Sequence, residues 1–373
     1  MTRLNSNIAL EDSSMKQRVA GFDLARALAI FGMVIVNFKV AMNSETGNPF
    51  LMWLAGLFEG RASALFVILA GIGVTFLTNK TRQSTDRLLE LQTRISLMKR
   101  GLLLIAIGLV YTPIWEADIL HFYGFYFLIA AAIFMVSGKT LLFFAAIIML
   151  MFPVLMLFFN YEQNWNWPTL TYENFWSFDG MIRHTVFNGF HPVFPWAAFL
   201  IFGMWLGRQK LSQPLIRKRL LAGSVITLLA TESGLYFIRT ILGDGSALAM
   251  TSEEVTFLLS TSIIPPLPQY VISAGSSAVI VLVGSLYFSQ RFSKSTINRW
   301  LYQTGQLSLT LYVAHVIIGM GILESIGRLD NETIDFSLLS ALIFCVCGIG
   351  FSVAWLKCFK TGPLEWIFRK VAS

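Results

Sequence analysis

The chain has 373 residues, of which 55% are hydrophobic and only 13% are charged, and its mean hydropathy is +0.65. Soluble globular proteins carry about 25% charged residues, so this composition excludes an ordinary soluble enzyme. The apolar runs are also too long for the short alternating strands of a transmembrane barrel. The composition therefore predicts an all-α, polytopic integral membrane protein built as a helical bundle.

The net charge of +7 does not predict a nucleic-acid partner. That inference needs a basic patch on a folded surface, whereas the basic residues here fall in short blocks between apolar runs. Such blocks are typical of membrane topology, because short cytoplasmic loops are enriched in Lys and Arg. We expect membrane lipids as partners and no nucleic acid.

Ten segments are long and apolar enough to be considered as spans, since a spanning helix needs about 20 mostly apolar residues. In chain order they are 21–40, 62–78, 100–113, 119–137, 140–159, 191–207, 219–239, 270–289, 303–323 and 336–356, with the third starting earlier, near Ile95. We expect a single transmembrane domain over 1–373, with polar tails at 1–19 and 357–373.

The charge pattern fixes the expected orientation. If the N-terminus lies inside, most of the 28 basic residues fall in cytoplasmic segments, so both termini are predicted to be cytoplasmic. Acidic residues fall mainly on the outer side. The longest outer segment, the loop 160–190, is rich in Trp, Tyr and Asn, which suits the headgroup layer and can also hold sugars.

Cysteines and histidines give no metal signature. Cys345, Cys347 and Cys358 lie in or beside the last apolar run and predict apolar packing instead of a disulfide framework. No HExxH pattern accompanies the histidines, so we expect no metal.

Ionisable side chains inside the predicted spans are candidate functional residues, because they are costly in lipid unless paired. Asp23 and Arg26 lie three residues apart on one face of the first span, either as a structural ion pair or as a phosphate site. Asn37 lies about 21 Å further along that helix. Glu232 lies mid-span with Tyr236 and Arg239 beyond it, as a proton path, an ion pair or part of a polar cavity.

The four histidines all lie outside the predicted cytoplasmic loops. His121 follows Asp118 by three residues at the outer start of the fourth span, where the carboxylate could orient the imidazole as in hydrolase triads. His184 and His191 flank the outer start of the sixth span, and His315 lies mid-membrane. The alternative for each is a packing histidine bonded to a neighbouring helix. Gly71 and Gly73 predict close helix approach.

Several stretches resemble a known family. Gly21–Ile30, continuing as Val34–Asn37, resembles the first span of membrane acetyltransferases of the heparan-α-glucosaminide N-acetyltransferase type. Three more stretches look like its bacterial branch: Arg61–Phe66 with Gly71, Phe194–Trp196 with Gly207–Arg208, and Thr304–Tyr312. The tail Gly362–Trp366 fits as well, so the resemblance covers nearly the whole chain.

The resemblance implies a multi-pass protein of the bacterial inner membrane that moves an acetyl group from cytosolic acetyl-CoA to an amino sugar across the membrane. The family motif carries over at Asp23, Arg26 and Asn37. The family's catalytic histidine would align near Asn48, which is not a histidine. Another residue must then act as the base, and we expect His121.

The expected function is therefore acyl transfer from acyl-CoA to a hydroxyl or amine of an extracytoplasmic glycan or lipid-linked sugar. A histidine would act as general base, and Asn37 or a backbone N–H would stabilise the oxyanion. The candidate residues are His121, Asp118, Asn37 and His315 for catalysis; Asp23, Arg26, Arg208 and Arg100 for the donor; and Arg61, His184, His191, Glu232 and Trp196 for the acceptor.

Two alternatives stay open. Glu232, His315 and Arg239 could form the relay of a small-solute transporter, although the chain shows no evident internal repeat of the kind many transporters carry. A non-catalytic scaffold is the other, because the family histidine is absent. The sequence leaves acceptor, acyl length and a homodimer undetermined.

The topology makes a direct prediction. Labelling of engineered cysteines in whole cells should place the segments holding positions 121 and 191 on the side opposite to the connector 79–100. Placement of all three on one side would contradict the predicted alternation and the chemistry built on it.

Overall fold

The computed structural model describes residues 2–242 and 251–372, with side chains described for 20–242 and 251–371. Its elements are α1 (Thr2–Ala41), α2 (Pro49–Gly56), α3 (Arg61–Leu77), α4 (Asn79–Arg82), α5 (Arg87–Tyr111), α6 (Leu120–Ile133), α7 (Gly138–Phe158), β1 (Trp165–Asn166), β2 (Thr171–Tyr172), α8 (Phe178–Arg183), the π-helix η1 (His184–Asn188), α9 (Val193–Gly207), α10 (Pro214–Leu242), α11 (Ser252–Leu258), α12 (Pro268–Arg291), α13 (Thr296–Gln306), α14 (Ser308–Ala314), the π-helix η3 (His315–Met320), α15 (Gly321–Ser325), α16 (Ile334–Cys358) and α17 (Pro363–Ala372).

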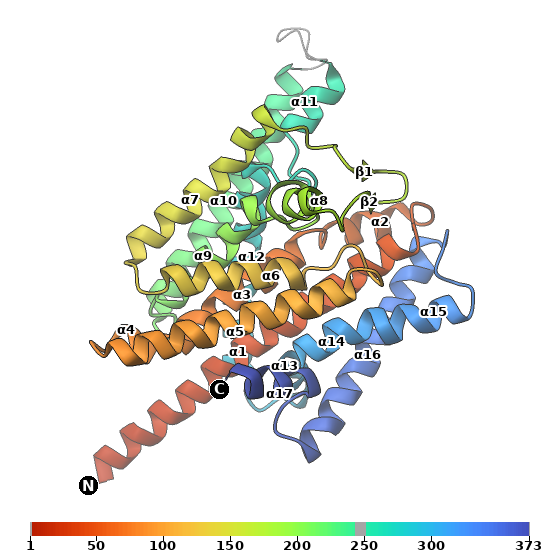
Figure 1. Ribbon diagram of the computed structural model, residues 1–373. Helices are drawn as coiled ribbons and strands as arrows, with labels where there is room; N and C mark the ends of the chain where they lie inside the picture. Colours follow the sequence, from red (N-terminus) through yellow and green to blue (C-terminus); the bar gives the residue numbers. More distant parts are fainter. Residues whose placement is uncertain (1, 243–250, 373) are drawn as a thin grey trace. The chain divides into compact units, whose positions relative to one another are not determined.

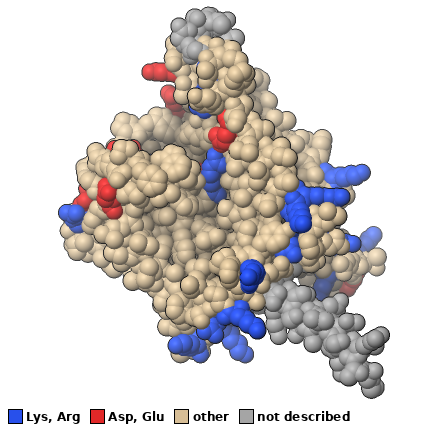
Figure 2. Space-filling view, turned by 180° about the vertical axis from the view of Figure 1, so that it is seen from behind, with Lys and Arg blue, Asp and Glu red and all other residues tan. Residues whose placement is uncertain are grey.

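The predicted class, an all-α polytopic membrane protein, is confirmed. Within the described ranges, regular structure is helical apart from a short antiparallel hairpin in which Trp165 pairs with Tyr172 and Asn166 with Thr171. Most of the surface visible in Figure 2 is uncharged. A surface of this kind suits contact with lipid, because lipid-facing positions exclude charge.

Each of the ten predicted spans falls on a helix, but not every one of these helices is a full span. Seven helices among the described residues are long and apolar enough to cross a membrane, and a bent pair, 178–188 with 193–207, can form an eighth. The remaining two predicted spans lie on α5 and α6. Helix α6 has only 14 residues, about 21 Å at 1.5 Å per residue, and the first half of α5 is highly charged.

The predicted orientation does not depend on these two helices. Because α5 and α6 are consecutive and pack against each other, omitting both leaves every later span on its predicted side. Figure 1 shows them lying side by side as a helical hairpin. The assignment of α5 and α6 as two of the ten spans stays a prediction.

One predicted span was wrong in its bounds, and two other predicted segments contain helix that the sequence did not indicate. The segment 303–323 is not one helix: α13 ends at Gln306, Leu307 takes non-helical torsion angles (φ −105°, ψ 24°), and α14 begins at Ser308. The loop 160–190 contains α8 and η1 at its end, so residues 178–188 are helical. The polar stretch expected as a tail, 2–19, continues α1 as helix.

The chain forms two compact units. The first comprises Met1–Phe66, Ser212–Leu221 and Ala278–Arg369, and the second comprises Val67–Leu211, Ala222–Ser277 and Lys370–Ser373. In the first unit α1 packs against α13, α14 and α16; in the second α5 packs on α6 and α9 packs on α6 and α7. The candidate residues are therefore described within each unit.

Close helix crossings depend on glycine in both units. In the second unit, a Cβ at Gly71 would overlap the Leu200 carbonyl and one at Gly203 would overlap the Ile68 carbonyl, so α3 and α9 approach backbone to backbone. The predicted close approach is confirmed at Gly71. It is wrong at Gly73, where a Cβ would meet nothing within 4 Å.

In the first unit, Gly305 of α13 plays the corresponding role. A Cβ there would overlap the backbone carbonyl of Asp23 on α1, and the next residue, Gln306, donates from Nε2 to Asp23 Oδ2 at 3.3 Å. The crossing of α1 and α13 thus determines where the Asp23 carboxylate lies.

We predict that Gly305→Ala destabilises the protein by about 1–3 kcal/mol, the usual cost of overpacking. The matched control is Gly284→Ala on α12, where a Cβ meets nothing within 4 Å and alanine favours the helix. Thermal unfolding in detergent measures both. Equal midpoints for the two variants would contradict the close crossing.

Candidate functional site

The Asp118 carboxylate lies at the start of α6. Its Oδ2 atom accepts hydrogen bonds from the backbone N–H groups of Leu120 (2.9 Å) and His121 (3.2 Å). The first turn of a helix has unsatisfied N–H groups and a positive dipole end, so a carboxylate is stabilised there. These two backbone hydrogen bonds therefore fix the position of the Asp118 carboxylate independently of the His121 ring.

His121 completes this arrangement. Its Nδ1 lies 3.1 Å from the same Oδ2 atom, and both side chains are buried. Because an ionised carboxylate only accepts hydrogen bonds, this partner assigns the ring hydrogen to Nδ1 and leaves the lone pair on Nε2. Nε2 is buried and has no hydrogen-bond partner among the described residues. The predicted pairing of Asp118 with His121 is present, and its geometry is that of an oriented general base.

The other two outer histidines lie close by in the same unit. The His184 ring stacks on that of His121, with centroids 5.6 Å apart. Phe122 contacts both His184 (5.2 Å) and His191 (6.0 Å), and His191 packs edge-on against Trp196 at 4.5 Å. The Nδ1 atoms of His184 and His191 have no partner among the described residues. The fold thus gathers three histidines that the sequence spreads over 70 positions.

Asn188 ties the hairpin to this cluster. Its Nδ2 atom donates to the carbonyls of Tyr161 and Gln163, both at 2.9 Å, and its Oδ1 atom accepts from the Tyr172 hydroxyl at 2.9 Å. Its own carbonyl accepts from Trp165 Nε1 at 2.6 Å. With every polar group of Asn188 satisfied, the aromatic hairpin is fixed over His184, whose ring meets Tyr172 edge-on at 4.6 Å.

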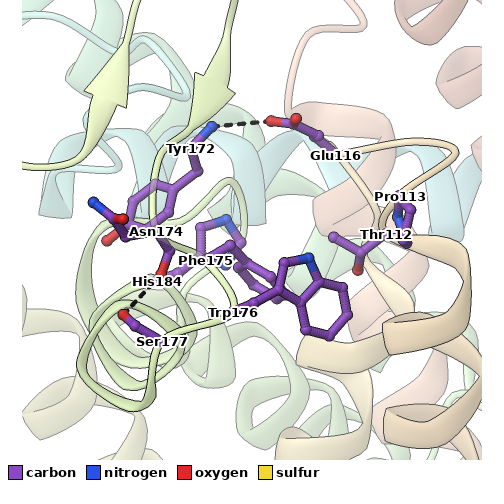
Figure 3. Close-up of a pocket in the computed structure, with 9 residues that line it drawn as sticks. All are labelled: Thr112, Pro113, Glu116, Tyr172, Asn174, Phe175, Trp176, Ser177 and His184. Atoms are coloured by element: carbon purple, nitrogen blue, oxygen red, sulfur yellow. Dashed lines mark hydrogen bonds between the residues drawn. The ribbon is translucent and has the colours of Figure 1, made fainter.

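A cavity of about 370 Å³ opens beside the cluster. Figure 3 shows Glu116 and Thr112 on one side and Tyr172, Phe175, Trp176 and His184 facing them. The remaining lining residues are Pro113, Asn174 and Ser177. Of the four histidines, His184 lines the cavity, and His121 lies behind it. Aromatic walls with a few polar groups are typical of small-ligand sites.

Glu116 is the ionisable acid of this cavity. Its Oε2 atom accepts the Tyr172 backbone N–H at 3.0 Å, as the dashed line in Figure 3 marks. Burial raises the pKa of Glu116, and the hydrogen bond from Tyr172 lowers it by less. Burial also raises the pKa of the Tyr172 hydroxyl, so both groups are held toward their neutral forms.

Asn37 and His315 form a second pair, in the first unit. Asn37 Nδ2 lies 2.9 Å from His315 Nε2, and His315 Nδ1 bonds the backbone carbonyl of Tyr312. A carbonyl only accepts, so Nδ1 carries the hydrogen and Nε2 accepts from the asparagine amide. His315 begins η3, as His184 begins η1; single π-turns inside helices are frequent at functional sites. These two predicted catalytic residues therefore contact each other.

The expected donor-binding residues have different surroundings. Arg26 pairs with Asp23 and stays about a third exposed, at 31%. Arg208 donates from its terminal nitrogens to the carbonyls of Val136 (2.6 Å) and Phe134 (2.9 Å) at the end of α6. Those bonds use one of the two hydrogens on each terminal nitrogen. Arg100 lies along α5 beside the α5–α6 crossing.

The remaining acceptor candidates do not all join the cluster. Trp196 is fully buried against His191. The Glu232 carboxylate accepts hydrogen bonds from the hydroxyls of Ser273 and Thr261. Arg61 begins α3 in the first unit. Among the described residues, no group of three or more His, Cys, Asp and Glu side chains is arranged to hold a metal.

Sequence reasoning missed three residues of this site. Glu116 is one of the acidic residues on the predicted outer side and was not singled out from the sequence. Its position two residues before Asp118 was a usable signal. Asn188 carries no signal of its own. Gly108 on α5 lies against the dyad, since a Cβ there would overlap the His121 backbone nitrogen and come within 2.8 Å of Asp118 Oδ2.

Comparisons with known proteins together cover nearly the whole chain. The profile of the family described as "Heparan-alpha-glucosaminide N-acetyltransferase, catalytic" matches residues 18–238, and that of a family of unknown function, DUF418, matches residues 204–373. The uncharacterized protein YxaH of Bacillus subtilis (strain 168) is 19% identical over 413 aligned positions, covering 97% of this chain and 96% of that protein.

The raised pKa of Glu116 predicts a pH effect. The folded protein favours the protonated carboxyl, so the stability that Glu116 contributes falls as pH rises above its ordinary value of 4.5 and through its raised pKa. Glu116→Gln keeps an acceptor for Tyr172 and removes the titration. The unfolding midpoint of the Gln variant should increase relative to that of wild type as pH rises. The exposed Glu173→Gln is the control, and a difference independent of pH would contradict the prediction.

Proposed function

Because the chain belongs to the heparan-α-glucosaminide N-acetyltransferase catalytic family, whose profile matches more than half of it, we propose that it is a membrane acyltransferase of the bacterial inner membrane. The donor we propose is cytosolic acyl-CoA, with acetyl as the first choice. The acceptor is a hydroxyl or amine of an extracytoplasmic glycan or lipid-linked sugar.

The Asp118–His121 pair is the observation that carries this proposal. Asp118 holds the His121 ring through Nδ1, so the basic nitrogen, Nε2, points away from the carboxylate and has no hydrogen-bond partner among the described residues. A general base needs this state: neutral, oriented and free to accept a proton from the attacking group. As His121 takes that proton, Asp118 stabilises the imidazolium that forms.

The cavity beside His184 supports the acceptor side of the proposal. Its volume, about 370 Å³, lies within the range of small-ligand sites, about 300–1,000 Å³. Trp176, Phe175 and Tyr172 offer flat apolar faces, and Glu116 and Asn174 offer polar groups for sugar hydroxyls or an amine. Two lining residues of the cavity, His184 and Phe175, contact the His121 ring, so we propose that the reacting group passes beside them to reach Nε2.

Acyl-CoA supplies the activated thioester when it is bound. In the first unit, the half-buried guanidinium of Arg26 retains exposed surface beside Asp23 and fits a phosphate, which arginine binds through two nitrogens. Arg208 already donates from both terminal nitrogens to carbonyls of the chain, so we assign the phosphate to Arg26 first.

The Asn37–His315 pair offers the alternative base. His315 Nε2 already accepts one amide hydrogen from Asn37, so it would have to exchange this bond for one to the acceptor. The second amide hydrogen of Asn37 can donate to a developing oxyanion, a role worth about 10²–10³ in rate at other sites. The His121 and His315 variants therefore separate the two assignments.

Transfer of radiolabel tests the proposal. Membrane vesicles containing the protein, supplied with labelled acetyl-CoA, should transfer label to their glycan or lipid fraction. His121→Ala and Asp118→Asn should each lower the initial rate by about 10²–10⁴-fold, the usual contribution of an oriented general base. Asp179→Asn, an exposed carboxylate at the start of α8, is the matched control and should keep the wild-type rate.

Thermal unfolding of each variant in detergent shows whether it is folded. A folded His121→Ala variant with undiminished transfer, together with loss in His315→Ala, would move the base to His315. Absence of transfer above empty vesicles with acetyl-, succinyl- and longer acyl-CoA donors would overturn the acyltransferase proposal.

A further inference from the structure

Two short amphipathic helices, α13 and α17, have one buried and one exposed face. In α13, Asn298, Thr304 and Gly305 are buried, whereas Ile297 is 60% and Trp300 is 42% exposed. In α17, Phe368 is buried and Trp366 is 54% exposed. Neither helix is long enough to span a bilayer, so their apolar exposed residues are not explained by a spanning role.

The two helices meet at the start of the same span. Glu365 of α17 accepts the backbone N–H groups of Leu309 (2.8 Å) and Thr310 (3.1 Å) and the Thr310 hydroxyl (2.6 Å), all at the N-terminus of α14. Helix α13 ends immediately before α14. The residue before α17 also touches this junction, since a Cβ at Gly362 would come within 2.9 Å of the Leu307 side chain. Both amphipathic helices therefore adjoin the start of α14.

The positions of neighbouring helix ends place this junction at a membrane boundary. Candidate spans α12 and α16 end at Arg291 and Cys358, directly before the segments that lead into α13 and α17. Helices that lie along a bilayer surface combine an apolar face, inserted between the headgroups, with a cationic face. Exposed tryptophan favours the same layer.

The charges of this region have one sign. The segments 291–306 and 357–369 together hold a single acidic residue, Glu365. Its carboxylate is bonded to the N-terminus of α14. The basic residues there are all exposed: Arg291, Lys294, Arg299, Lys357, Lys360 and Arg369. Such a cluster beside spans attracts anionic headgroups.

We propose that α13 and α17 form a binding surface for anionic phospholipid, with Trp300, Ile297 and Trp366 among the acyl chains and the cations on the phosphates. The surface adjoins the Asp23–Arg26 pair, because Gln306 at the end of α13 donates to Asp23. Bound lipid therefore stabilises the α1–α13 crossing.

Thermal unfolding of the whole protein tests this surface. In nonionic detergent, added phosphatidylglycerol should raise the unfolding midpoint of wild type more than phosphatidylcholine does, because a ligand of the folded state stabilises it. The triple variant Lys294→Gln, Arg299→Gln, Arg369→Gln should lose most of this difference and keep the wild-type midpoint in phosphatidylcholine.

The matched control removes the same charge elsewhere. Lys210→Gln, Lys218→Gln, Arg219→Gln changes three exposed cations, one in the loop before α10 and two in its first turns, and should keep the wild-type response. Equal loss in both triple variants would show a response to net charge alone and overturn the proposal, as would an unchanged response in the α13–α17 variant. Phosphatidylglycerol retained after purification, counted by mass spectrometry, should fall only in the α13–α17 variant.

Discussion

The hydrogen bonds accepted by Asp118 are the constraint on which the second unit depends. A carboxylate with no exposed surface is costly unless donors surround it, and the first turn of α6 supplies two N–H groups before His121 supplies its ring. The glycine at position 108 gives the carboxylate room, since any side chain there would collide with this turn. One residue thus sets the start of α6, the orientation of His121 and the depth at which the imidazole lies.

Polar atoms around the cluster divide into two groups. Asn188 and the Tyr172 hydroxyl are paired, as expected of buried polar groups in a rigid structure. The ring nitrogens Nε2 of His121 and Nδ1 of His184 and His191 are buried without a partner among the described residues. Unsatisfied atoms of this kind are expensive to keep. Because His184 lines the cavity and stacks on His121, we propose this region for a bound acceptor that supplies the missing hydrogen bonds.

Two arginines bind backbone carbonyls at the C-terminal end of α6 and so have a structural role. Arg94 donates to the carbonyls of Ala131 and Ala132, and Arg208 to those of Phe134 and Val136, so two cations stabilise the end of α6. The last carbonyls of a helix carry partial negative charge and lack partners in the helix. A cation at such an end stabilises the helix, whereas Arg26 pairs with Asp23 and keeps exposed surface. Charge near the membrane is therefore a poor guide to function until its partners are known.

Hydropathy by itself predicted the class of the protein and the approximate positions of its long apolar helices, because burying apolar side chains in lipid depends on the local run of residues. The spacing of three residues between Asp118 and His121 also predicted their contact. The break at Leu307 and the helical conformation of 178–188 depend on packing and were not predictable. Only the tertiary structure brought Asn37 to His315, 278 positions away, or gathered His184 and His191 around Phe122. Contacts between such distant residues depend on which helices cross closely at glycine. This is a property of the whole bundle and not of any local sequence pattern.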